Sequence, residues 1–242
     1  MSKNCIFCGQ DSTKSTSVEH IIPESLGNDK YILDRGIVCD SCNNYLAREV
    51  EKPILDLDDY KRVRFYQAIQ SKKKRIPFSD ALIVGDKVDF HWGKMNGKQV
   101  LMMGVSEETA MKIIKQKPEV FFTKGITLND PGVSYEISRF IAKVGIEMYT
   151  YNIIEHYKKR AEYDDQTSLI VDDSMYEVID FVRRGRKNKK PWCYTAEIIH
   201  EYSLFTDEII AKMDFSIEKD HVYFIMTLFN TRFKLNMSSD SY

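Results

Sequence analysis

The sequence lacks several features that would assign it to a class at once. No apolar run approaches the roughly 20 residues that span a bilayer, and the opening residues, MSKNCIFCGQ, contain no apolar segment of a secretory signal. We therefore expect a cytoplasmic protein without a membrane partner. An excess of one charge is also missing, since 35 basic and 36 acidic residues give a net charge of −1. A polycationic nucleic-acid coat is excluded, and any affinity for nucleic acid must come from local patches.

Two runs of basic residues could supply such patches. The first consists of Lys72, Lys73, Lys74 and Arg75, and the second lies within residues 183–190. Either run could instead be a solvated surface. Aromatic residues near the runs could pack on sugars or bases, or could belong to the core. These aromatic residues are Phe65, Tyr66, Trp192 and Tyr194.

Cysteine is scarce but patterned. Four of the five cysteines form two CxxC pairs, Cys5 with Cys8 and Cys39 with Cys42. Four thiolates in this pattern predict a tetrahedral zinc site, and because cysteine fills every position the zinc should be structural. Two disulfides or buried thiols are the alternatives, and a reducing compartment disfavours disulfides. The fifth, Cys193, is expected to be a small buried apolar residue.

The hydrophobic patterning predicts an α+β fold in two parts, a zinc-stabilised module over residues 1–54 and a mixed α+β domain over residues 55–242. In the module we expect a hairpin around residues 15–38 and a helix from about Asn43. Further helices are expected over residues 55–72, 106–116, 134–160 and 172–185, and strands within residues 76–92, 98–105 and 214–237. In the longest helix, one apolar face should pack in the core. Its residues are Ile137, Phe140, Ile141, Val144, Met148 and Tyr149.

A short motif lies between the cysteine pairs. Glu19-His20-Ile21-Ile22-Pro23 follows the first pair, and Asn43 comes directly after the second. In this order the elements resemble the HNH endonucleases, in the branch with a four-cysteine zinc knot, over residues 5 to about 51. The resemblance implies a ββα-metal module that hydrolyses phosphodiester bonds. It implies that His20 is the general base, and that Glu19 and Asn43 hold a catalytic Mg²⁺ or Mn²⁺.

The chemistry agrees with these roles, because a histidine titrates near working pH and oxygen ligands suit Mg²⁺. Several assignments stay open. Glu19 stands where many relatives have Asp or His, and the middle Asn of the family could be Asn28 or lie near Asp34-Arg35. Other residues could extend the site, with Asn44 replacing Asn43, Glu49 or Glu51 as a further ligand, and Arg48 on a phosphate.

We therefore expect a metal-dependent endonuclease acting on DNA. RNA cleavage or a toxin role is a third option, and a homodimer is a further option. The rival from another class is a zinc-stabilised nucleic-acid-binding or interaction module without catalysis. The second domain would supply target recognition, dimerisation or regulation, and defence against phage is one setting that fits a chain of this kind.

Overall fold

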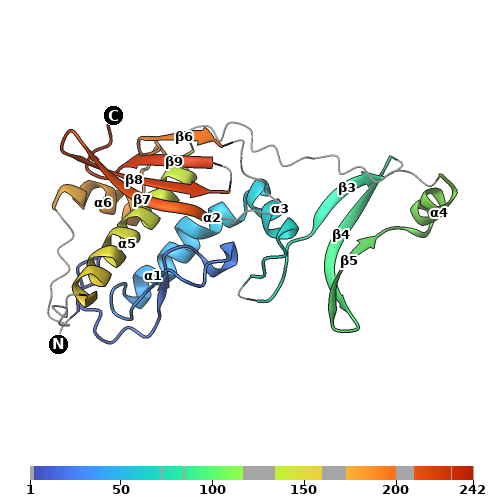
Figure 1. The fold of residues 1–242 in the computed structure, drawn as a ribbon, viewed down its shortest axis with the longest axis horizontal. Coiled ribbons are helices and arrows are strands. Elements are labelled where there is room, and N and C mark those ends of the chain that lie inside the picture. The colour runs from blue at the N-terminus through green and yellow to red at the C-terminus, as the bar shows by residue number, and fades with distance from the viewer. Residues whose placement is uncertain are drawn as a thin grey trace.

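The computed structural model describes residues 3–71, 73–83, 85–116, 134–159, 173–199, 210–229 and 231–241. Helices and strands are mixed along the chain, which confirms the predicted α+β class (Figure 1). Within these residues no helix combines the length and the apolar character that crossing a membrane requires.

The N-terminal segment forms a ββα unit. Strands β1 (Glu19–His20) and β2 (Ile32–Leu33) pair antiparallel, with Glu19 opposite Leu33. Helix α1 (Asp40–Leu46) follows and continues through a π-helical turn, η2 (Ala47–Glu51), into α2 (Lys52–Leu55). The helix begins three residues before the expected Asn43 because Cys39 caps it, its sulfur accepting from the backbone N–H of Cys42 at 3.4 Å. A short 3₁₀ helix, η1 (Glu24–Leu26), lies in the loop between the strands.

The single helix predicted over residues 55–72 was wrong in extent. Leu57 is extended, with φ −65° and ψ 138°, and so ends the path of α2. Helix α3 (Asp58–Tyr66) starts anew with Asp58 and Asp59 in its first turn, where acidic side chains stabilise a helix N-terminus. Ala68, at φ 53°, lies just beyond its C-terminus.

The predicted strands over residues 76–105 are confirmed. They are β3 (Ser79–Ile83), β4 (Asp86–Met95) and β5 (Lys98–Gly104), which form an antiparallel sheet in that order, followed by α4 (Glu107–Gln116). This arm projects away from the rest of the molecule (Figure 1). It has a small core of its own, to which α3 contributes one ring, made of Phe65, Ala81, Ile83, Val88 and Phe90.

The remaining elements are built around one long helix. They are α5 (Tyr135–Lys159), η3 (Asp173–Met175), α6 (Tyr176–Arg184), and strands β6 (Tyr194–Ile198), β7 (Ile210–Glu218), β8 (His221–Leu228) and β9 (Thr231–Asn236). The strands form an antiparallel sheet in the order β6-β9-β8-β7, and β6 was not predicted. Helix α5 packs closely on this sheet, since a Cβ at Gly145 would lie 2.9 Å from Met237 and 3.0 Å from Phe224.

One hydrophobic core runs from Cys5 to Met237 and so includes residues on both sides of position 54. Helix α5 lies at its centre, contacting β2, η2 and α2 on one side and β9 and α6 on the other. The predicted apolar stripe is buried from Ile137 to Met148, and Tyr149 is half-buried. Because neighbours cover α5 on several sides, polar residues between the stripe positions are buried as well. The domain boundary near residue 54 stays a prediction.

Candidate active site and zinc knot

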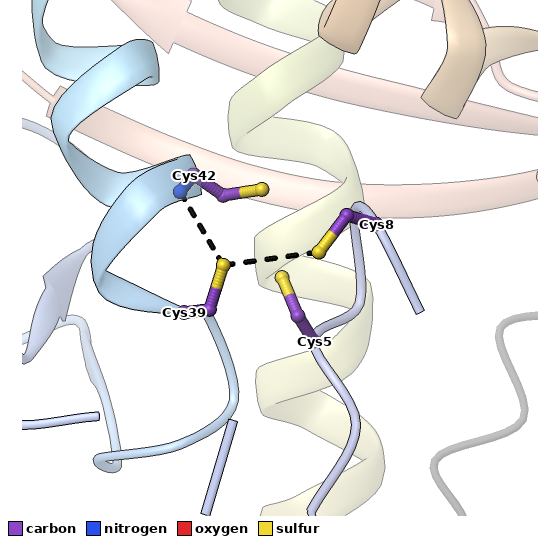
Figure 2. A group of neighbouring side chains, drawn as sticks. All are labelled: Cys5, Cys8, Cys39 and Cys42. Carbon is purple, nitrogen blue, oxygen red and sulfur yellow. Dashed lines mark hydrogen bonds between the residues drawn. The ribbon is translucent and has the colours of Figure 1, made fainter. Parts of the chain in front are cut away.

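The two cysteine pairs form one sulfur cluster. Cys5 and Cys8 lie on a tight knuckle in which the Gly9 N–H donates to the Cys5 carbonyl at 2.8 Å, with Gly9 at φ +69°. Cys39 and Cys42 lie at the start of α1, and the four sulfurs fall within 4.8 Å of one another (Figure 2). Tetrahedral zinc with bonds of about 2.3 Å places its sulfurs about 3.8 Å apart. The 3.8 Å between the Cys8 and Cys39 sulfurs matches that spacing, so the four side chains fit a structural metal ion.

The thiols of the cluster interact strongly with one another. A hydrogen bond with the Cys42 thiol lowers the pKa of Cys5 to about 4, and the same contact raises the pKa of Cys42. Burial raises the pKa of Cys8. Thiolates gathered this closely repel one another unless a cation lies among them, which is the electrostatic condition that a bound zinc satisfies.

A carboxylate at the start of α1 ties the helix to the segment that precedes β1. Asp40 accepts from the backbone N–H and hydroxyl of Ser17, at 2.9 and 2.6 Å, and from the backbone N–H of Thr16 at 3.1 Å. These bonds lower the pKa of Asp40 to about 2. The cap of α1 therefore fixes the zinc ligands and the strand leading to His20 together.

Along β1 the side chains alternate between outside and inside. Val18 is exposed, Glu19 is buried, and His20 is half-buried. This alternation is the strand geometry that the sequence predicts, and it places Glu19 and His20 on opposite faces. Asn43 lies on the outer side, where its Nδ2 donates to the Val18 carbonyl at 3.0 Å. That bond directs the amide oxygen of Asn43 away from the strand backbone.

Glu19 meets a buried lysine of α5. The Nζ of Lys143 donates to Glu19 Oε1 at 2.7 Å and to Glu51 Oε1 at 2.8 Å, and it lies 2.9 Å from Glu147 Oε2. It also donates to the carbonyls of His20 and Ile21, at 3.0 and 3.2 Å. Lys143 is fully buried. One cation thus holds two carboxylates of the ββα unit and the carbonyls of two successive peptides, His20–Ile21 and Ile21–Ile22.

The balance of charge in this buried cluster is uneven, with three carboxylates around one ammonium. Burial alone would lower the pKa of Lys143, but the carboxylates, Glu147 first among them, raise it well above its ordinary value. Burial raises the pKa of Glu147 well above its ordinary value despite the neighbouring Lys143. The cluster therefore joins α5 to β1 through buried ion pairs.

Asn28 closes the loop between the two strands of the hairpin. It is buried, and its Nδ2 donates to the carbonyls of Ile22 and Tyr31 at 2.8 and 3.0 Å. Its Oδ1 accepts from the N–H groups of Lys30 and Tyr31 at 3.1 and 3.0 Å. Asp34, the rival position for the middle Asn, is exposed and pairs with Lys158 at 3.1 Å. Of the two, Asn28 has the contacts of a loop-orienting residue.

The remaining predicted site residues that the structure describes are exposed. Arg48 is exposed and pairs with Glu49 at 2.6 Å. Lys73, Lys74 and Arg75 are exposed in the loop after α3, while Lys72 lies outside the described residues. Asn44 is exposed on α1.

The second basic run is partly structural. Arg186 pairs with Asp240 at 2.8 Å and lies 5.2 Å from the ring centroid of Trp192. Trp192, Tyr194 and Phe65 are buried, which favours the core alternative for these three rings.

Sequence reasoning missed the buried charges of α5. Lys143 and Glu147 are separated by four residues, and Arg139 by four more. Arg139 donates to the Val182 carbonyl at 2.7 Å, to the Glu49 carbonyl at 3.3 Å and to the Tyr45 hydroxyl at 2.6 Å. The available signal was charge at helical spacing inside an otherwise apolar helix, which indicates buried pairing when both sides of the helix are covered.

Comparison with known proteins agrees with the motif. Residues 5–56 match the family model described as HNH endonuclease, about a fifth of the chain. No curated protein and no solved structure matches the chain. The match confirms, for residues 5–56, the resemblance to the HNH endonucleases that the sequence predicts.

Proposed function

We propose that this chain is a metal-dependent endonuclease whose ββα module hydrolyses phosphodiester bonds in DNA, with His20 as the general base. The observation that carries the proposal is the bond from Asn43 to the carbonyl of Val18, which lies two residues before His20. This bond sets an oxygen-bearing amide beside the imidazole-bearing strand. The family match over residues 5–56 supports the same reaction class.

The protein groups have separate tasks in this proposal. His20 accepts the proton of the attacking water, and its half-buried position allows both contact with solvent and a fixed orientation. Lys143 holds the carbonyls of His20 and Ile21, and Asn28 fastens the loop that follows. These contacts therefore fix the backbone that carries His20 before any substrate binds.

A divalent cation would be held by the amide oxygen of Asn43, and when bound it stabilises charge on the phosphate and on the leaving oxygen. Among the described residues, the four cysteines alone bring together three or more metal-binding side chains of the His, Cys, Asp and Glu types. A sparse oxygen site fits Mg²⁺ or Mn²⁺, because Mg²⁺ commonly takes one or two protein ligands and completes its shell with water and phosphate oxygens. The sulfur cluster fits structural Zn²⁺.

Glu19 has two readings within the proposal. In the first it acts through Lys143 as a positioning residue, as its buried ion pair suggests. In the second it turns a carboxylate oxygen to the cation, as the family resemblance implies. Glu19→Gln separates them. The first predicts slower cleavage with an unchanged dependence on Mn²⁺ concentration, and the second predicts that more Mn²⁺ is needed for half-maximal rate.

Plasmid cleavage tests the proposal directly. Supercoiled DNA is incubated with the full chain and Mg²⁺, Mn²⁺ or EDTA, and zinc content is measured in parallel. His20→Ala should lower the cleavage rate about 10²–10⁴-fold, the usual contribution of a general base, without changing the thermal unfolding midpoint. His156→Ala, the same substitution at an exposed position of α5, is the matched control and should cleave like the wild type.

The contrary outcomes are also defined. Cleavage by His20→Ala at the wild-type rate would remove His20 from the reaction. Binding of DNA that survives both His20→Ala and Asn43→Ala, with no cleavage by the wild type under any ion, would establish the non-catalytic binding module instead. Running the same assay on a single-stranded RNA of equal length shows whether RNA is the preferred substrate.

A further inference from the structure

A cavity of about 630 Å³ lies where the ββα unit meets the arm. Its walls come from η1, α2, α3 and the start of β3, with Lys87 of β4, so it is separate from the sulfur cluster and from Asn43. The lining residues are Ser25, Lys52, Leu55, Asp56, Asp58, Lys61, Arg62, Arg64, Ser71, Pro77, Phe78, Ser79, Asp80 and Lys87. Five of them are basic and three are acidic, which gives the wall a formal charge of +2.

The acidic residues of the wall already have cationic neighbours within it. Lys52 lies 3.5 Å from Asp56, Lys61 lies 3.7 Å from Asp58, and Lys87 lies 3.3 Å from Asp80. Arg62 pairs at 3.5 Å with Asp59, a carboxylate outside the lining. Arg64 is thus the one basic residue of the wall that has no ion pair within the described part of the chain.

Arg64 is a buried residue, only 7 % exposed, and its Nε is a buried donor that makes no hydrogen bond within the described part of the chain. No ion pair within 4 Å joins Arg64 to a carboxylate of the described residues. Arg64 lies between Val63 and Phe65, both buried, so the helix itself holds it in place. Burial lowers the pKa of Arg64, and the nearby charge of Asp56 opposes this shift only in part. A buried cation in this state is costly unless an anion completes it.

An aromatic ring lies in the same cavity. Phe78 is 61 % exposed although it lines the wall, and it contacts His91 with ring centroids 6.0 Å apart. An exposed ring beside a cation in a concave site is the pairing that holds a base and its phosphate, because every base can stack on an aromatic face. Guanidinium groups match phosphate through paired N–H donors.

We propose that this cavity binds a nucleotide, with Arg64 on the phosphate and Phe78 against the base. The nucleotide could be free or could be one unit of a nucleic-acid strand that passes beside the ββα unit. The chemistry is the same for both sources, and binding here does not require the cleavage proposed above. Measurements without added Mg²⁺ or Mn²⁺ therefore keep the two proposals separate.

Thermal unfolding and calorimetric titration of the full chain test the site, with inorganic phosphate, deoxyadenosine, deoxyadenosine monophosphate and a phosphorylated tetranucleotide as probes. At ten times its Kd the monophosphate should raise Tm by about 3–6 °C. Deoxyadenosine, which lacks the anion, should give no shift at the same concentration. A tetranucleotide that binds at least tenfold more tightly than the monophosphate identifies a strand as the source, and equal affinity identifies the free nucleotide.

Two substitutions locate the binding. Arg64→Met should raise Tm without ligand, since an unpaired buried charge is removed, and should abolish the shift caused by the monophosphate. Arg64→Lys keeps the charge but loses the paired donors, and it should bind the monophosphate at least tenfold more weakly. This second variant keeps the test valid if Arg64→Met fails to fold. Arg232→Met, at an exposed position of β9, is the matched control and should keep the full shift.

Phe78→Ala separates the base from the phosphate. This substitution should lower the affinity for deoxyadenosine monophosphate and should leave the weaker affinity for inorganic phosphate unchanged. The proposal is overturned if the monophosphate gives no shift, if deoxyadenosine gives an equal one, or if the shift persists in both Arg64 variants.

Discussion

Replacing Lys143 with methionine tests the buried cluster that joins α5 to β1. The ammonium lies 2.7, 2.8 and 2.9 Å from oxygens of Glu19, Glu51 and Glu147. At an effective dielectric of 20, each attraction is about 6 kcal/mol before desolvation is counted. Most of this is offset, because burying the lysine is costly and because the orphaned carboxylates of the variant can take up protons. Removing one partner of a buried pair typically costs about 3–5 kcal/mol.

We therefore expect Lys143→Met to lower the unfolding free energy by about 3–5 kcal/mol, and Tm by about 6–20 °C for a chain of this size. The loss should depend on pH. Without the cation, the pKa of Glu147 in the folded state rises further, because the charge of Lys143 no longer opposes the effect of burial. Stability from such groups is present below their unfolded value, 4.5 for glutamate, and is lost as pH rises through the folded value. The deficit should thus be smallest near pH 4.5 and should grow towards neutrality.

The assay is thermal and urea unfolding between pH 4.5 and 8, followed by circular dichroism. Lys158→Met is the matched control, because Lys158 lies on the same helix with its side chain 39 % exposed and paired with Asp34 and Glu155. Surface pairs contribute about 0–1 kcal/mol, so this variant should remain close to the wild type. A loss below about 1 kcal/mol in Lys143→Met, or a deficit that does not change with pH, would refute the argument that the lysine neutralises the cluster.

Three further predictions concern the ββα unit. Cys42→Ser should release the metal, which elemental analysis would detect as a fall from one zinc per chain to less than half. The same substitution should broaden the thermal unfolding transition or lower its midpoint. Full retention of zinc would contradict the four-sulfur site. Wild-type stability should decline as pH falls from 3.8 towards 2, because the pKa of Asp40 is lowered to about 2, and Asp40→Asn should flatten that decline in a pH series of Tm values; identical pH profiles would be the contrary result. Asn28→Ala removes four hydrogen bonds within a buried loop and should cost about 1–3 kcal/mol in urea unfolding, while Asp34→Ala, at the exposed rival position, should cost less than about 1 kcal/mol.

The sequence was most informative where chemistry is local. Two CxxC pairs predicted the sulfur cluster because only a few residues fix each knuckle and the first turn of α1. Alternation along Val18, Glu19 and His20 predicted opposite faces, since a strand has a period of two. The first strand pair of the arm followed from its alternation and from the turn at Gly85, which adopts positive φ.

What could not be predicted depends on contacts between distant segments. Glu19 meets Lys143 across 124 positions, and Arg64 lines a cavity together with residues of α2 and the arm. Strand β6 escaped notice because its partner β9 comes some forty residues later in the chain. Hydrophobic periodicity predicts which side of a helix or strand is apolar, but it does not predict how many other segments will pack against that helix or strand. This is why the buried charges of α5 were not predicted.

The π-helical turn at Ala47–Glu51 holds one residue more than an α-helical path between the same two ends would need. The segments before and after it can therefore face different partners, Cys42 towards the sulfurs and Glu51 towards Lys143. Deletion of one residue is compatible with the fold at this one place, because it would convert the π-helical turn into a regular α-helix without rotating the segment on either side. Elsewhere in the helix the same loss would swing everything beyond it by about 100°. Homologous chains aligned to this one should tolerate a single gap there and nowhere else along the helix.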